Sequence, residues 1–225
     1  GLAAVHSEGR NREAIWDSMQ RKETYGTSGD RILLWFDLIS EESVIPMGGA
    51  VETSNNLSFK VKAVGAFKQK PGCPDYSSTS LTSEDLETIC KNECYNPSDE
   101  RKVITRIEVI KITPQINANE NVNNLIQDPW KVFDCPRSQS GCSITFSDKE
   151  YSLEQRDAAY YVRAIQESSP TINSENIRCE YNNDGQCIKV NACYGDYRTS
   201  KNDDCLSMSE ERAWSSPIFV DYKNL

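Results

Sequence analysis

The N-terminal residues that could carry out chemistry are a histidine, an acidic residue and two arginines. His6 is the one histidine of the chain, and Glu8 follows it two positions later. An imidazole and a carboxylate at this spacing could act as general base, general acid or metal ligand. Arg10 and Arg12 could bind an anionic substrate group, because planar guanidinium groups match phosphate and sulfate oxygens. The alternatives are a structural hydrogen bond for His6 and a solvated helix start for the two arginines.

A turn further along, Thr-Ser-Gly-Asp-Arg, offers two more polar candidates, Ser28 and Arg31. Both could line the same site as His6 and contribute a hydroxyl and a guanidinium to substrate binding. A turn whose glycine ends a preceding helix explains them equally well. The candidate catalytic residues are thus His6 and Glu8, and the candidate substrate-binding residues are Arg10, Arg12, Ser28 and Arg31.

Nine cysteines are many for a chain of 225 residues, and eight of them fall into close pairs. The pairs are Cys90 and Cys94, Cys135 and Cys142, Cys179 and Cys187, and Cys193 and Cys205. Their gaps do not match the short knuckles of zinc sites, so disulfides formed in an oxidising compartment are favoured over a metal. Cys73 is left over: it is a free thiol, a competitor for Cys90 or Cys94, or the partner of a cysteine outside this chain.

Composition argues against two classes of partner. With 34 acidic and 25 basic side chains the net charge is -9, and no Lys/Arg cluster offers a local basic patch, so nucleic acid is not an expected partner. The longest apolar run, around Ile32 to Phe36, is far shorter than the roughly 20 residues that span a bilayer, so no membrane span is expected.

Several common catalytic and binding motifs are also missing from the sequence. It has no P-loop, no G-x-S-x-G elbow and no H-E-x-x-H helix. The aspartates in the cysteine-flanked loops could bind calcium, but solvated loops are favoured because no EF-hand pattern is present. Trp214 could stack on a sugar, although a core anchor is the favoured interpretation.

The spacing of apolar residues predicts one N-terminal helix followed by strands. Residues 11–25 have helical spacing, with Asn11 as the cap and Ile15, Met19 and Trp16 directed to one buried face. Strict alternation from Leu57 to Val64 is the clearest strand signal. Further strands are expected at 32–36, 103–112, 143–146, 158–166 and 218–222, and a short helix at 83–90. We therefore expect a mainly β chain: an antiparallel β-sandwich with long disulfide-pinned loops and one N-terminal helix.

Several stretches resemble the C-terminal part of a bacterial family catalogued as domain of unknown function 3604. They are residues 1–19, 21–32, 71–75, 90–101, 160–167 and 213–220. Full-length members look like relatives of the polymerase and histidinol phosphatase (PHP) superfamily, whose distorted barrel holds divalent metal ions for phosphoester or related hydrolysis. The metal-binding H-x-H and D-x-H signatures of that family have no counterpart in this sequence.

The resemblance implies a division of the chain and a function. Residues 1–30 would be the last strand and helix of a PHP-like barrel, with His6 near its rim, and residues 31–225 a C-terminal β-sandwich. The chain would be a non-catalytic fragment of an exported, periplasmic or secreted hydrolase. It would carry no cofactor itself, while the parent binds a divalent metal. Its partner would be the rest of its own parent, or a second copy through the N-terminal helix. The alternative is an accessory module that binds a glycan or a protein.

Overall fold

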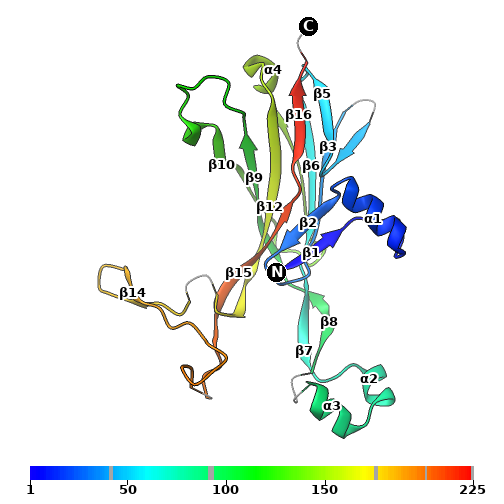
Figure 1. The fold of residues 1–225 in the computed structure, drawn as a ribbon, viewed down its shortest axis with the longest axis vertical. Coiled ribbons are helices and arrows are strands. Elements are labelled where there is room, and N and C mark those ends of the chain that lie inside the picture. The colour runs from blue at the N-terminus through cyan, green and yellow to red at the C-terminus, as the bar shows by residue number, and fades with distance from the viewer. Residues whose placement is uncertain (41–42, 91–93, 175–176, 201, 224–225) are drawn as a thin grey trace.

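Strand pairing among the described residues of the computed structural model creates one large sheet, one smaller sheet and two two-stranded hairpins (Figure 1). The structure describes residues 1–40, 43–90, 94–174, 177–200 and 202–223. The eight-stranded sheet follows the order β1-β2-β15-β12-β16-β5, with β9 on β12 and β10 on β9. Its strands are β1 (Leu2–Val5), β2 (Thr24–Thr27), β5 (Ala50–Thr53), β9 (Ile104–Ile112), β10 (Ile126–Asp134), β12 (Ala158–Ile172), β15 (Leu206–Ser215) and β16 (Ile218–Tyr222). All described pairs in it are antiparallel except β16 with β5, which is parallel.

The smaller sheet has four antiparallel strands in the order β11-β6-β3-β4. Its strands are β3 (Leu33–Ile39), β4 (Val44–Pro46), β6 (Leu57–Val64) and β11 (Cys142–Asp148). The prediction that Leu57 to Val64 form a strand with one buried face is confirmed. The buried residues of β6 are Leu57, Phe59, Val61 and Ala63.

The two sheets contribute side chains to one hydrophobic core. Phe59 of β6 lies between Phe36 of β3 and Phe146 of β11, with ring centroids 5.5 and 5.1 Å away. Tyr160 of β12, in the other sheet, lies 4.8 Å from the Phe59 ring. Each fully buried aromatic side chain contributes roughly 1.5–3 kcal/mol through the hydrophobic effect. This aromatic cluster is therefore a main source of stability shared by the two sheets.

The predicted N-terminal helix is shorter than expected and buries a different face. Helix α1 (Arg12–Gln20) begins at Asn11, whose side chain accepts a hydrogen bond from the Ala14 amide at 2.8 Å. The predicted continuation to Tyr25 is wrong, because residues 24–27 form β2 and pair with β1 and β15. The predicted burial of Trp16 and Met19 is also wrong: their exposed fractions are 59% and 52%.

Two arms extend from the sheets in Figure 1. The first is the hairpin of β7 (Phe67–Pro71) and β8 (Tyr95–Arg101), which carries α2 (Asp75–Ser80) and α3 (Ser83–Cys90). The second contains the small hairpin of β13 (Glu180–Tyr181) and β14 (Cys187–Lys189). The remaining elements are η1 (Val122–Asn124) and α4 (Tyr151–Glu154).

The described residues form four disulfides, and three of them join predicted pairs: Cys135–Cys142, Cys179–Cys187 and Cys193–Cys205. The predicted pair of Cys90 with Cys94 is wrong, because Cys94 is bonded to Cys73 with their Cα atoms 4.8 Å apart. The reason is the register of the first arm: Pro71 lies opposite Tyr95, which brings the flanking residues 73 and 94 together. The side chain of Cys90 lies outside the described part of the chain.

None of the helices in the described ranges has the length and apolar content needed to cross a bilayer. The four disulfides indicate an oxidising environment for the folded chain.

Candidate functional site

His6 lies immediately after β1 and connects the two sheets. Its backbone amide donates to the Glu23 carbonyl oxygen at 2.9 Å, which continues the pairing of β1 with β2. Its Nε2 atom lies 2.8 Å from the Leu34 carbonyl oxygen in β3. Because a carbonyl oxygen only accepts, Nε2 carries a proton, so Nδ1 is the acceptor atom of the neutral tautomer. The ring centroid lies 5.4 Å from that of Tyr25 and 5.7 Å from that of Trp35.

A hollow of about 260 Å³ opens beside the His6 ring. It is lined by His6, Glu23, Trp35, Phe36, Asp37, Pro46 and Met47. Burial raises the pKa of Asp37, and the neighbouring His6 and Lys60 oppose that rise without cancelling it. An imidazole and a carboxyl group with a raised pKa are the residue types used for general acid and base chemistry.

The other predicted site residues do not gather around His6. Glu8, Arg10, Arg12 and Arg31 are all exposed. Ser28 follows β2 at the end where Leu2 pairs with Thr27, while His6 lies at the opposite end, where Val5 pairs with Thr24. The hydroxyl of Ser28 donates to the Glu211 carboxylate, and its oxygen accepts from the Arg212 amide at 2.9 Å.

Glu23, Trp35 and Asp37 line the hollow beside His6, although no sequence motif predicts them there. Alternation along β3 was the available signal, because Leu34, Phe36 and Leu38 are buried and the residues between them share the other face. That alternation puts Trp35 and Asp37 side by side on one face. It does not reveal which strand covers them.

A second polar cluster lies inside the core and was missed entirely. Lys111 of β9 and Asp148 of β11 each have 1% of their side chain exposed, and Lys111 Nζ lies 2.8 Å from Asp148 Oδ2. The hydroxyl of Tyr160 donates to the same Oδ2 at 2.7 Å. Glu154 of α4 reaches Lys111 Nζ with its Oε2 at 2.6 Å.

Electrostatics in this cluster follow from its burial. Burial alone would raise the pKa of Asp148, but hydrogen bonds from Lys111 and Tyr160 outweigh it and hold the pKa below its usual value. Burial and the Asp148 carboxylate both raise the pKa of Tyr160. Lys111 Nζ also lies 5.4 Å from the Trp130 ring centroid. The spacing of Ile107, Val109 and Lys111 could have indicated an inward lysine, since all three lie on one face of β9.

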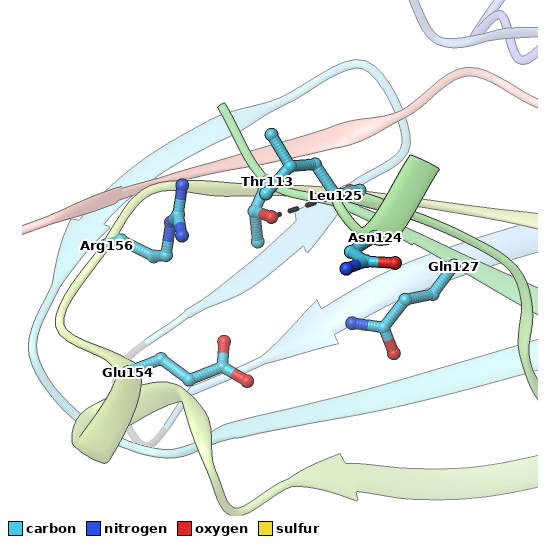
Figure 2. A pocket seen from close by; sticks show the side chains of 6 residues that line it. All are labelled: Thr113, Asn124, Leu125, Gln127, Glu154 and Arg156. Atoms are coloured by element: carbon cyan, nitrogen blue, oxygen red, sulfur yellow. Dashed lines mark hydrogen bonds between the residues drawn. The ribbon is translucent and has the colours of Figure 1, made fainter. Parts of the chain in front are cut away.

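A hollow of about 290 Å³ lies next to this cluster, and Figure 2 shows the side chains that line it. It is lined by Thr113, Asn124, Leu125, Gln127, Glu154 and Arg156. Glu154 belongs to both features, because its carboxylate contacts the buried ammonium and its side chain also lines the hollow. The Glu154 carboxylate therefore lies between the buried ammonium of Lys111 and the hollow.

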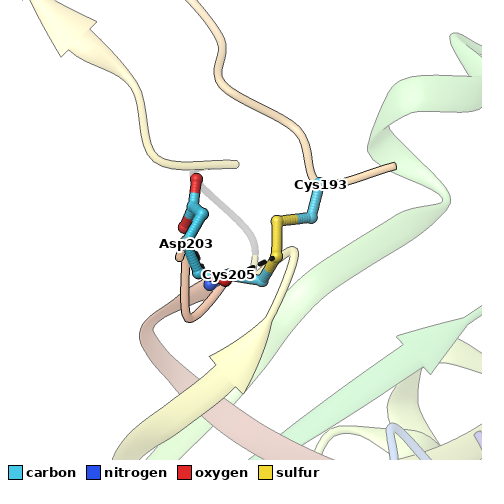
Figure 3. Close-up of side chains that lie close together, drawn as sticks. All are labelled: Cys193, Asp203 and Cys205. Atoms are coloured by element: carbon cyan, nitrogen blue, oxygen red, sulfur yellow. Dashed lines mark hydrogen bonds between the residues drawn. A yellow bond between two sulfur atoms is a disulfide. The ribbon is translucent and has the colours of Figure 1, made fainter. Parts of the chain in front are cut away.

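Among the described residues, one group of three metal-ligating side chains clusters: Cys193, Asp203 and Cys205 (Figure 3). Their ligand atoms lie within 4.8 Å of one another. Both sulfurs belong to one disulfide, and the Asp203 carboxylate accepts from Arg178 at 2.5 Å. In the oxidised protein, therefore, this group provides no thiolate ligand.

An exposed cleft of about 750 Å³ lies beside the same disulfide. Tyr194 and Tyr197 line it, and the Arg198 guanidinium lies 3.8 Å from the Tyr194 ring centroid. The exposed fraction of Tyr197 is 94%. Exposed aromatic rings of this kind are suited to stack on the apolar faces of sugars or on other aromatic groups.

One comparison with known proteins found a match. Residues 1–37 match the model of a family described as "Protein of unknown function (DUF3604)". No curated protein and no solved structure matches the chain. The matched segment contains β1, α1, β2 and most of β3. The N-terminal part of this chain is therefore similar to a family whose function is not known.

Proposed function

We propose that this chain is the non-catalytic β-rich portion of an exported PHP-like hydrolase that uses a divalent metal to cleave phosphoesters or related bonds. The observation that supports it is how the family-matched segment is built into the fold. Strand β2 pairs with β15, and β3 pairs with β4 and β6, so matched and unmatched residues share both sheets. A β-sandwich is the arrangement that we propose for the two sheets, since their side chains meet in one core.

In this proposal residues 1–30, which belong to the large sheet through the pairing of β2 with β15, present a docking surface to the barrel of the parent. Strand β1 ends the order of the large sheet, so its outer edge can accept a further strand. Trp16 and Met19 of α1 and Leu2 of β1 are exposed apolar side chains near that edge. A surface of this kind suits contact with the rest of the parent chain better than with water.

The cellular site that we propose is the periplasm or the outside of the cell. Four disulfides support it, because thiols are kept reduced in the cytosol. In the parent, the metal would be held by residues outside this chain.

The test compares the parent with this chain, both purified without chelator. Stoichiometric divalent metal and phosphoester hydrolysis in the parent alone are the expected result. Metal-free, inactive parent protein would reject the hydrolase assignment. Amide exchange in β1 and α1 should also be slower in the parent. Trp16→Ser should remove that protection, while Leu153→Ser, at an exposed site on α4, should leave it unchanged.

A second candidate function, binding of a glycan or a protein, is favoured by the exposed cleft beside Tyr197. Its aromatic rings lie on a loop that the Cys193–Cys205 disulfide closes, which reduces the entropy lost on binding. The test is a glycan array followed by titration of any hit. Tyr197→Ala should abolish binding, and Tyr76→Ala, at an exposed site in the other arm, should preserve it. Binding that survives Tyr197→Ala would exclude the cleft.

A further inference from the structure

The Lys111–Asp148 pair spans the two sheets through the interior. Lys111 belongs to β9 of the large sheet, and Asp148 is the last residue of β11 in the smaller one. Tyr160 lies directly opposite Lys111 in the pairing of β9 with β12, and its hydroxyl also contacts Asp148. The amine and the carboxyl group are therefore held together by three strands of the core.

We propose that Lys111 Nζ and Asp148 Cγ condense into an amide, an intramolecular isopeptide bond, with Glu154 as the proton-transfer residue. The 2.8 Å separation between Nζ and Oδ2 puts the amine beside the carboxyl carbon that it would attack. Reacting groups fixed in this way gain a very large effective concentration over the same groups free in water. The buried strands supply that fixation without a ligand or a second protein.

The surroundings favour the condensed product over the ion pair. The side chains of Lys111 and Asp148 each have an exposed fraction of 1%. The aromatic rings of Trp130 and Tyr160 lie beside the Lys111 ammonium. Two charges taken out of water carry a desolvation cost for as long as the pair stays ionised. An amide removes both charges from the core. The leaving water has an exit, because Glu154 lines the hollow of Figure 2.

The two oxygens of Asp148 have different partners, which assigns them different roles. Oδ1 accepts a hydrogen bond from the Glu150 amide at 3.0 Å, so it can hold the negative charge of a tetrahedral intermediate and remain as the amide oxygen. Oδ2 accepts from Tyr160 and Lys111, both donors that can pass a proton to a departing oxygen. Oδ2 is therefore the oxygen that leaves.

The reaction balances without an oxidant or an activating co-reactant. The Nζ–Cγ bond forms and the Cγ–Oδ2 bond breaks. The ammonium gives up two of its three protons, and both end on Oδ2, which leaves as water. Glu154 Oε2, 2.6 Å from Nζ, accepts the first proton as the amine becomes nucleophilic and returns it to the departing oxygen. The charge of Glu154 is the same before and after.

The first experiment is the intact mass of the whole chain after full reduction of its disulfides. The proposal expects a mass lower than the sequence mass by one water. An unmodified mass after prolonged incubation of the folded protein would overturn it. Because an Asp-Gly step such as Asp184–Gly185 can also lose one water by forming a succinimide, the bond must be located by peptide mapping.

Trypsin does not cleave after an acylated lysine, so the linked product has a unique composition. It joins residues 107–131 to residues 138–149 in one branched peptide, whereas the unlinked chain yields 107–111 and 138–149 separately. Loss of water without the branched peptide would also reject the bond.

Two variants test the role of Glu154. Glu154→Gln should fold, as judged by circular dichroism, and keep the full sequence mass. Glu52→Gln alters an exposed carboxylate of β5, outside the cluster, and should still lose one water. A branched peptide in Glu154→Gln at the rate of the unsubstituted chain would exclude Glu154 as the proton-transfer residue.

Discussion

His6 Nε2 lies 2.8 Å from the carbonyl oxygen of Leu34, and this hydrogen bond joins the end of β1 to β3 across the two sheets. The residue predicted to act as a catalyst therefore also has a structural role. Its ring also lies near the rings of Tyr25 and Trp35, with centroids 5.4 and 5.7 Å away, so one side chain provides both a hydrogen bond and apolar contact.

The effect of replacing His6 on the free energy of unfolding should show how much this hydrogen bond stabilises the fold. His6→Ala loses a hydrogen bond between partly buried groups, so the free energy of unfolding should fall by about 1 kcal/mol or somewhat more. Urea denaturation with the disulfides intact gives the value. Arg10→Ala, at an exposed neighbouring position, is the matched control and should change little. Equal stability of His6→Ala and the unsubstituted chain would show that the bond contributes nothing.

The raised pKa of Asp37 predicts how stability depends on pH at this site. Burial disfavours the carboxylate, so the folded state holds the proton more tightly than the unfolded state does. Protonated Asp37 is therefore compatible with the folded state at low pH. The free energy of unfolding decreases as the pH rises through the pKa that Asp37 has in the folded protein, because the buried carboxylate then becomes charged. Asp37→Asn should accordingly be more stable than the unsubstituted chain at neutral pH. The gain should vanish below the unfolded pKa of an aspartate, about 3.9. Thermal unfolding across pH 3 to 7 measures the difference.

Truncation of Phe59 should damage the whole fold. Its ring is fully buried and contacts aromatic rings of both sheets, so Phe59→Ala leaves a cavity that should cost about 3–5 kcal/mol. Leu153→Ala, with 74% of the side chain exposed, should cost under about 0.5 kcal/mol. Denaturant unfolding followed by circular dichroism compares them. A small loss for Phe59→Ala would contradict a core shared by the two sheets.

Removal of the Cys73–Cys94 disulfide should destabilise the arm formed by β7, β8, α2 and α3 without destabilising the two large sheets. The bond closes a segment with a sequence separation of 21 residues that contains α2 and α3, neither of which has a residue in the hydrophobic core cluster. Cys73→Ser should therefore speed proteolysis between residues 74 and 94 by an order of magnitude or more, consistent with the roughly 3 kcal/mol assigned to loops of this size. Mass spectrometry of the cut sites measures it. Cleavage spread equally over β6 and β12 would contradict the independence of the arm.

Much of the secondary structure could be predicted because it depends on local periodicity. The strands around Phe59, Val109 and Val162 have alternating or continuous apolar residues and form where the pattern placed them, although the strand around Val162 continues to Ile172, beyond its predicted end at residue 166. The N-cap at Asn11 was equally local. The end of α1 could not be predicted from local sequence. Thr24 to Thr27 form β2 because they pair with β1 and with residues 213–215 of β15, which are remote in sequence.

The sequence by itself determined the mainly β character, which depends on residue type and local periodicity. It favoured oxidised cysteines paired across short loops without fixing their connectivity, and three of those pairs are disulfides in the structure. Tertiary structure decided the partner of Cys94, the exposure of Trp16, the neighbours of His6 and the burial of Lys111 beside Asp148. These four outcomes depend on which strands pair and in what register. A register joins residues far apart in the chain, and the free energy that selects it comes from the whole core, so no local pattern contains it.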